Sequence, residues 1–302
     1  MTNEQRIKKL SVPQGRVDVV LDTDAYNEID DQFAISYLLK SKEKLNTKAI
    51  YAAPFFNHKV SSPAEGMEKS YDEILNILKL LGEETPVFKG SSNYLEDENT
   101  PVISDAAYDL AQRVNEYSPQ EPLYVVAIGA ITNVASAILL NSKMCENAVV
   151  IWLGGHAHHY HNSLEFNMKQ DVAAARVVVN SGVPFIQLPC RGVVSEFTLS
   201  KPELECWFKG KNELADYLTD ITIKEMGERT KSQLWSKVIW DVTAVAWLLN
   251  DNDRFMLSRI ITAPLPSYDN LYTQNYGGYP MRYVYSINRD NLMTDLLRKL
   301  TE

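Results

Sequence analysis

Short apolar runs alternate with longer segments of helical periodicity along the first two thirds of the chain. The first run spans residues 17–21, and the segment after it places Ile29, Phe33 and Tyr37 at four-residue steps, the spacing of one helix face. Further apolar runs that predict strands occupy residues 47–55, 86–90, 123–129, 147–155 and 183–190. This alternation is typical of βαβ units and predicts a mostly parallel sheet.

The segments between these runs predict helices on the faces of the sheet. Residues 66–82 have helical periodicity and end at a glycine, and residues 132–140 and 171–182 follow the next strands in the same way. After about residue 199 the pattern is mainly helical, with possible strands at 259–265 and 281–287. The predicted fold class is therefore α/β, an open and mostly parallel sheet with a Rossmann-like core and a helical C-terminal elaboration. Because no linker or repeat interrupts the pattern, we expect one domain over residues 1–302, with residues 1–15 as an N-terminal extension.

The composition is that of a globular protein and argues against several classes. Of the 302 residues, 45% are hydrophobic and 23% charged, and the net charge of −9 argues against a nucleic-acid-binding surface. The three cysteines lack CxxC spacing, so a disulfide scaffold is not expected. The N-terminus lacks the apolar segment of a secretory signal, and no run reaches the roughly 18 apolar residues of a membrane span. We therefore expect a cytoplasmic protein with neither a nucleic-acid nor a membrane partner.

Unusual polar segments follow four of the predicted strands. They are residues 22–31, 56–59, 129–133 and 154–167. Because ligands of open parallel sheets bind outside the carboxyl ends of the strands, these segments are expected to form one site.

The first of these segments, DTDAYNEIDD, holds five carboxylates: Asp22, Asp24, Glu28, Asp30 and Asp31. Capping of the following helix accounts for Asp30 or Asp31. It does not account for Asp22 and Asp24, which alternate directly off a buried strand and lose hydration there. A divalent cation would offset the repulsion, and an all-oxygen ligand set suits a hard ion, Ca²⁺ or Mg²⁺.

Two families begin with a strand followed by DxD. Phosphatases of the haloacid-dehalogenase type fit poorly, because Tyr26 stands at the fifth position and no late acidic motif follows a strand. The segment LDTDAYNEIDDQFAI instead resembles the DxDxxxDDxxA signature of the inosine–uridine preferring nucleoside hydrolases, with two additional residues between Asp24 and Asp30. Three further segments resemble that family in the same order: VAIGAITNVASAI, SLEFNMKQDVAAA and KVIWDVTAVAWLL.

The resemblance implies a Ca²⁺ ion that binds the ribose 2′- and 3′-hydroxyls and a water molecule. Asp24 would be both a metal ligand and the base that activates this water. Asp31 and Asp241 would be further metal ligands, together with the backbone carbonyl of Ile128. The implied reaction is hydrolysis of the N-glycosidic bond of a small-molecule ribonucleoside to free base and ribose.

The resemblance also implies substrate contacts. Asp30 would accept a hydrogen bond from the 2′-hydroxyl, Asn167 would bind the 3′-hydroxyl, and Glu165 would hold the 5′-hydroxyl. Asn57 would face the positive charge that develops on the sugar. Asn162 is the nearest counterpart of a further loop asparagine of the family.

The residue before Asp241 is Trp240, where many relatives have a histidine that protonates the leaving base. An indole cannot donate that proton, but its face stacks on a purine, and purine-specific relatives also have tryptophan there. We therefore expect purine nucleosides as substrates and a role for Trp240 in leaving-group departure. The sequence leaves the opposite face of the base open among Trp235, Tyr71, Phe55 and Phe56.

The run HAHHYH, residues 156–161, allows three interpretations: a zinc site, a substrate contact, or a loop with neither. We assign the substrate contact to His159. Arg191 has no counterpart in the family pattern and suggests either an anionic substrate or an ion pair with an acidic loop. Two alternative functions stay open, a non-catalytic Ca²⁺-dependent nucleoside or sugar binder and a hydrolase of another N-ribosyl compound. By analogy with relatives, we expect a homodimer or homotetramer.

Overall fold

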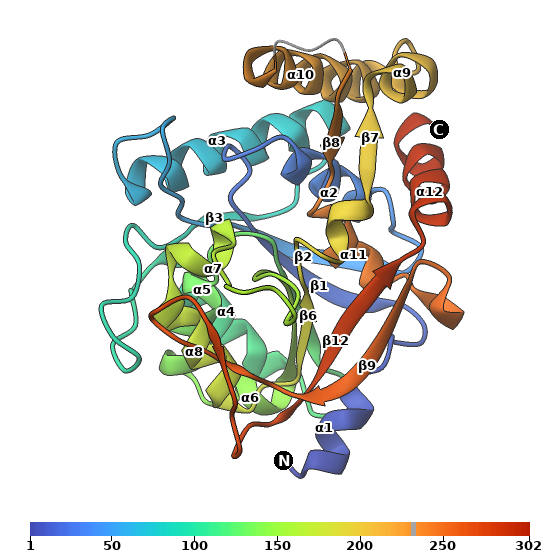
Figure 1. The fold of residues 1–302 in the computed structure, drawn as a ribbon. Helices are drawn as coiled ribbons and strands as arrows, with labels where there is room; N and C mark the ends of the chain where they lie inside the picture. Colours follow the sequence, from blue (N-terminus) through green and yellow to red (C-terminus); the bar gives the residue numbers. More distant parts are fainter. Residues whose placement is uncertain (231–233) are drawn as a thin grey trace.

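The computed structural model describes residues 1–230 and 234–302, and its centre is an eight-stranded sheet (Figure 1). The strand order is β3-β2-β1-β4-β5-β6-β12-β9, and every neighbouring pair is parallel except β12 and β9. The strands are β1 (Val17–Thr23), β2 (Leu45–Ala52), β3 (Val87–Lys89), β4 (Leu123–Ala127), β5 (Ala148–Leu153), β6 (Phe185–Leu188), β9 (Met256–Thr262) and β12 (Pro280–Ile287). The predicted α/β class with a mostly parallel sheet is confirmed.

Helices cover both faces of the sheet and bury two separate apolar cores. One core lies under α4 (Asp105–Arg113), α5 (Thr132–Leu140) and α8 (Val172–Ser181). The other lies under α2 (Asp30–Leu39), α3 (Pro63–Leu81), α11 (Val242–Trp247) and α12 (Arg289–Thr301). The sheet is therefore the middle of three layers, which is why β1, β4, β5 and β6 consist of nearly continuous apolar residues.

The chemistry of the helix ends shows why the sequence pattern predicts their positions. Ser62 caps α3 by accepting a hydrogen bond from the backbone of Glu65, and Pro63 occupies the first turn, where its missing N–H is not needed. Gly82 ends the same helix with φ of 66°, a left-handed conformation that glycine adopts without steric cost.

Several elements were not predicted. Helix α4 presents mainly alanines to the core, which give a weak apolar signal. Two small antiparallel pairs also form, β7 (Thr198–Ser200) with β8 (Ser236–Val238), and β10 (Leu265–Pro266) with β11 (Tyr272–Thr273). The short helices α6 (Met144–Asn147) and α7 (Phe166–Gln170) were not predicted either. Helices α9 (Lys201–Glu203) and α10 (Glu213–Arg229) fall in the region predicted as mainly helical, and they lie beside each other at the end of β7 and β8 (Figure 1).

The first fifteen residues pack onto the fold. They contain α1 (Asn3–Lys9), from which Arg6 donates a 2.8 Å hydrogen bond to the carbonyl of Gly182. Leu10 is fully buried, and its carbonyl accepts a hydrogen bond from Arg282. Among the described residues, no helix combines the length and apolar character required to cross a bilayer.

Candidate functional site

A cavity of about 390 Å³ opens at the carboxyl ends of the central strands. It lies where β1 and β4 are neighbours and the chain has reversed the direction in which it adds strands, which is the usual ligand position in such sheets. All but two of the predicted site residues line it: Asp24, Asp30, Asp31, Asn57, Ile128, Glu165, Asn167, Trp240 and Asp241. The structure therefore brings together segments that are up to about two hundred residues apart in the sequence.

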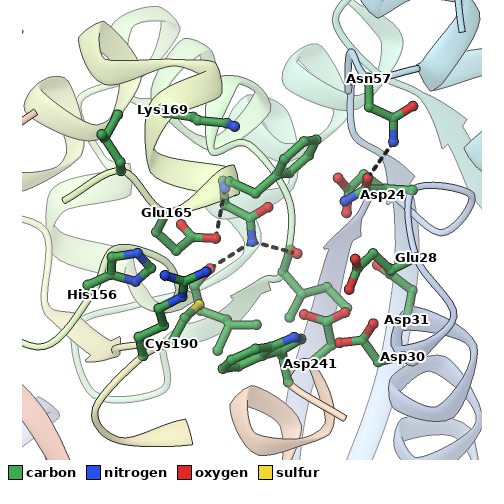
Figure 2. Close-up of a pocket in the computed structure, with 18 of the residues that line it drawn as sticks. Asp24, Glu28, Asp30, Asp31, Asn57, His156, Glu165, Lys169, Cys190 and Asp241 are labelled. Atoms are coloured by element: carbon green, nitrogen blue, oxygen red, sulfur yellow. Dashed lines mark hydrogen bonds between the residues drawn. The ribbon is translucent and has the colours of Figure 1, made fainter. Parts of the chain in front are cut away.

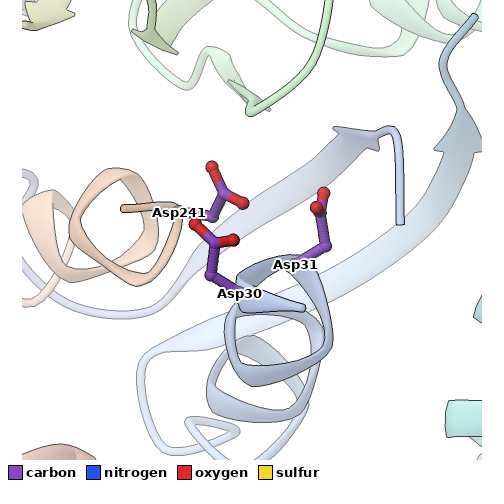
Figure 3. Close-up of side chains that lie close together, drawn as sticks. All are labelled: Asp30, Asp31 and Asp241. Carbon is purple, nitrogen blue, oxygen red and sulfur yellow. The ribbon is translucent and has the colours of Figure 1, made fainter. Parts of the chain in front are cut away.

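Three carboxylates at this cavity lie close enough to share a cation. Asp30 and Asp31 form the first turn of α2, and Asp241 stands at the start of α11 (Figure 3). Each offers an oxygen within 4.8 Å of the other two, and all three side chains are buried. Asp24 follows the end of β1 and, in the view of Figure 2, lies on the Asn57 side of this group. The tightest carboxylate group thus contains Asp30, which the resemblance assigns to the ribose, rather than Asp24.

The electrostatics of the group are unfavourable without a counter-ion. Burial, and then the charges of Asp31 and Asp30, raise the pKa of Asp24 well above its usual value. Burial and repulsion from Asp30, Asp31 and Asp24 do the same to the pKa of Asp241. Burial, with a contribution from Asp30, raises the pKa of Asp31 to about 8. Each carboxylate is therefore destabilised in its charged form, first by burial and then by its charged neighbours.

One oxygen of this cluster is also unsatisfied. Oδ2 of Asp24 is buried and has no hydrogen-bond partner in the part of the chain that the structure describes, whereas Oδ1 of Asp30 lies 3.3 Å from the amine of Lys237. Buried polar atoms without partners are rare and costly, so their presence at a cavity indicates a missing ligand. Oxygen-only donors of negative charge fit a hard cation such as Ca²⁺.

Asn167 fixes the floor of the cavity. Its Nδ2 donates 3.0 Å hydrogen bonds to the carbonyls of Ile128 and Leu153, which follow β4 and end β5 (Figure 2). Ile128, whose backbone carbonyl is the predicted metal ligand, lines the same cavity as the carboxylates. Cross-linking of two strand ends by one amide explains why an asparagine is suited to this position.

Glu165 has a structural role in addition to its predicted substrate contact. It is the N-cap of α7, and its carboxylate accepts hydrogen bonds of 2.9 Å from the backbone N–H groups of Gly155, Asn167 and Met168. These three donors stabilise the charged form, although burial still raises the pKa of Glu165 overall. Glu165 thereby holds the loop after β5 against the start of α7.

The amide of Asn57 is held by its own neighbours. Its Nδ2 donates to Oδ1 of Asn27 at 2.9 Å, and its Oδ1 accepts from the backbone N–H of Lys59 at 2.8 Å. Asn27 belongs to the lengthened loop after β1, so this loop and the loop after β2 position each other. Trp240 is half-buried at the cavity wall.

The sequence offers four aromatic residues as stacking partners opposite Trp240: Trp235, Tyr71, Phe55 and Phe56. None of them lines the cavity, and Phe55 is fully buried in the core. The lining instead includes Phe166, which sequence reasoning missed although it lies between Glu165 and Asn167.

The histidine-rich loop differs from the prediction. His159 is exposed against Tyr160, and Asn162 accepts a hydrogen bond from the backbone of Leu164; neither residue lines the cavity. His156 lines it instead, with a buried Nδ1 that has no partner among the described residues. The one group of possible metal ligands found among residues 1–230 and 234–302 is acidic and contains no histidine, so the zinc interpretation has no support.

A charged network at the cavity edge was not predicted. Glu28, from the lengthened loop, pairs with Arg229 at 2.7 Å and with the buried Lys237, whose Nζ also lies 3.3 Å from Asp30. Burial and then the charge of Lys237 act on the pKa of Asp30 in opposite directions, and the net effect is a raised pKa.

The comparisons with known proteins decide the family. Residues 19–264 match the family model described as inosine-uridine preferring nucleoside hydrolase. The chain belongs to this nucleoside hydrolase family. A search of curated proteins finds no match.

Solved nucleoside hydrolases share the fold along nearly their whole length. A plant nucleoside hydrolase is 21% identical with a TM-score of 0.76, and the alignment covers 96% of this chain and 99% of that one. A purine-preferring ribonucleoside hydrolase from Gardnerella vaginalis is 19% identical with a TM-score of 0.74, covering 94% and 98%. The type III effector protein XopQ, solved in complex with adenosine diphosphate ribose, is 15% identical with a TM-score of 0.71, covering 100% and 99%. At these identities the likeness shows the fold alone.

Proposed function

We propose that the protein hydrolyses the N-glycosidic bond of ribonucleosides, with a preference for purines, and that it requires Ca²⁺. The observation that carries this proposal is the buried carboxylate cluster at the cavity, whose charges repel one another and beside which Oδ2 of Asp24 lacks a partner among the described residues. Family membership supports a small-molecule nucleoside as the substrate.

The cation would be held by Asp31 and Asp241, by Asp24 or Asp30, and by the carbonyl of Ile128. When bound, Ca²⁺ would orient the ribose hydroxyls and lower the pKa of a water molecule. It would also remove the mutual repulsion that raises the carboxylate pKa values, so that these groups are ionised at neutral pH.

The residues of the chain supply the rest of the chemistry. Asp24, with its unpartnered oxygen at the cavity, accepts the proton of the attacking water. Cleavage builds positive charge on the ribose ring, and the carboxylates together with the Asn57 amide stabilise that charge as it develops. Trp240 offers a ring face on which a purine stacks as it leaves.

A nucleoside panel assayed for released ribose, with and without chelator, tests this proposal. We expect release from inosine, loss of release in chelator, and at least about 100-fold lower release in Asp24→Asn, since general base catalysis contributes about 10²–10⁴-fold. Asp18→Asn is the matched control, because Asp18 lies at the opposite end of β1, where it contacts Asn46, Tyr117 and Lys48. No ribose release from any nucleoside would refute the proposal.

A second candidate is a Ca²⁺-dependent binder of an N-ribosyl compound without turnover. It is favoured by the pairing of Asp30 with Lys237, because this carboxylate is then partly neutralised before any sugar binds. In that case calorimetry would detect ligand binding in the presence of Ca²⁺ while the ribose assay stays negative for the unmodified protein. The complex of XopQ with adenosine diphosphate ribose makes that compound a useful addition to the panel.

A further inference from the structure

The cavity has two ends of opposite charge. The carboxylates of α2 and α11 form one end. The other end is formed by the loops after β5 and β6 and by α7, and it carries His156, Lys169 and Arg191. The loops that carry His156 and Arg191 are tied together, since the backbone N–H of Ala157 donates to the carbonyl of Arg191 at 2.9 Å.

The cations at this end have no anionic partner of their own. Within residues 1–230 and 234–302, neither Lys169 nor Arg191 forms an ion pair with a carboxylate, whereas Arg229 at the same cavity pairs with Glu28 and Glu225. Lys169 rests over the ring of Phe166 at 5.3 Å, and in Figure 2 its amine is directed toward the side of the cavity where Asn57 lies. The nearby carboxylate of Glu165 does not take up this charge, because its hydrogen bonds are made to three backbone N–H groups.

His156 is the independent sign of a ligand here. Its side chain is about nine-tenths buried, with 6% exposure, and it lines the cavity next to Glu165 (Figure 2). Its Nδ1 is buried without a hydrogen-bond partner in the described part of the chain. A buried ring nitrogen without a partner, in a cavity that also holds the unpaired guanidinium of Arg191, is suited to an oxyanion that contacts both groups.

The orientation of ribose follows from the proposed function, on which this inference rests. With the 2′,3′-diol at the carboxylates and the 5′-oxygen at Glu165, as the family resemblance implies, the C5′ carbon lies toward the cationic end, because His156 is next to Glu165 (Figure 2). We propose that this end binds a phosphate on the ribose 5′-oxygen, so that ribonucleoside 5′-phosphates are hydrolysed in preference to the unphosphorylated ribonucleosides. A phosphate carries about −1.5 to −2 charges at pH 7, and a guanidinium matches two of its oxygens at once.

The test compares inosine with inosine 5′-monophosphate in the Ca²⁺-loaded full-length protein, by release of hypoxanthine. We expect kcat/KM to be at least about 10-fold higher for the monophosphate than for inosine. The preference for the monophosphate, meaning the ratio of the two kcat/KM values, should fall about 10–100-fold in Arg191→Ala, which is the range of a charged hydrogen-bonding contact. Arg191→Lys should keep an intermediate ratio. Arg16→Ala is the control, because Arg16 is exposed at the amino end of β1 and should leave the ratio unchanged.

The outcomes separate this inference from the proposed function. If inosine is hydrolysed as well as or better than its monophosphate, the phosphate subsite is refuted while nucleoside hydrolysis stands. If neither compound is hydrolysed, the hydrolase proposal is refuted, and calorimetry with ribose and ribose 5-phosphate decides about the subsite. If ribose 5-phosphate binds at least about 10-fold more tightly than ribose, and Arg191→Ala removes this difference, the phosphate subsite is supported. Equal affinities for the two compounds would overturn the phosphate subsite.

Discussion

Removal of Lys237 is expected to destabilise the protein strongly. Its side chain is 5% exposed, contacts Glu28, and lies 3.3 Å from Asp30. Loss of one partner of a buried ion pair costs about 3–5 kcal/mol, because the remaining charge is left uncompensated. Arg229 still neutralises Glu28 at 2.7 Å, so the loss falls mainly on Asp30. We therefore expect Lys237→Met to lower the free energy of unfolding by about 3 kcal/mol at neutral pH, the lower end of that range.

Urea unfolding followed by tryptophan fluorescence measures this change at one fixed concentration of chelator. The matched control is Lys42→Met, which removes a surface ion pair with Glu83 and should cost less than about 1 kcal/mol. Without Lys237 the pKa of Asp30 rises further, so the loss should be smaller at pH 5 than at pH 8, because a protonated Asp30 needs no partner. If Lys237→Met and Lys42→Met lower the free energy of unfolding by the same small amount, the buried ion pair between Lys237 and Asp30 does not stabilise the protein.

Three further predictions concern the site. Trp240→Ala should lower kcat/KM for purine nucleosides about 3–10-fold and Trp240→Phe less, as expected for a stacking contact; equal values for both variants would argue against stacking. 2′-Deoxyinosine lacks the hydroxyl that would donate a hydrogen bond to the Asp30 carboxylate, so it should react at least about 10-fold more slowly than inosine. Comparable turnover of the two nucleosides would contradict a contact between Asp30 and the 2′-hydroxyl. In chelator, the raised pKa of Asp31, about 8, means that the folded protein holds more protons than the unfolded chain between about pH 4 and 8. The free energy of unfolding should therefore fall as pH rises through this window, and Ca²⁺ should abolish that fall. If the melting temperature in chelator does not fall between about pH 4 and 8, this prediction is refuted.

The sequence predicted the sheet and the floor of the site because both depend on local pattern. Burial on both faces makes β1 and β4 continuous apolar runs, and the polar residues that follow each strand must meet at one edge. Asp24 could be placed in this way without knowledge of any tertiary contact, whereas Ile128 was assigned through the family resemblance. The end of β1 was set two residues early, because an alternating polar residue such as Asp22 is not distinguishable from a loop residue by apolarity alone.

The walls of the site could not be predicted in the same way. Glu28 and Lys237 are 209 residues apart, and nothing in either segment specifies the other. In the histidine-rich loop, the sequence alone does not distinguish which of several histidines contacts the substrate. The path of the backbone then decides which one faces the cavity, and it selects His156 rather than His159. Long-range pairing and loop path depend on the complete fold, and the sequence pattern records only local burial.

Calorimetric titration of chelator-treated protein with CaCl₂ tests the central claim most directly. The account predicts uptake of one Ca²⁺ ion per chain, accompanied by a higher melting temperature, and loss of this uptake in Asp31→Asn. Absence of binding heat together with an unchanged melting temperature in the unmodified protein would contradict it, because the buried carboxylates would then have some other purpose.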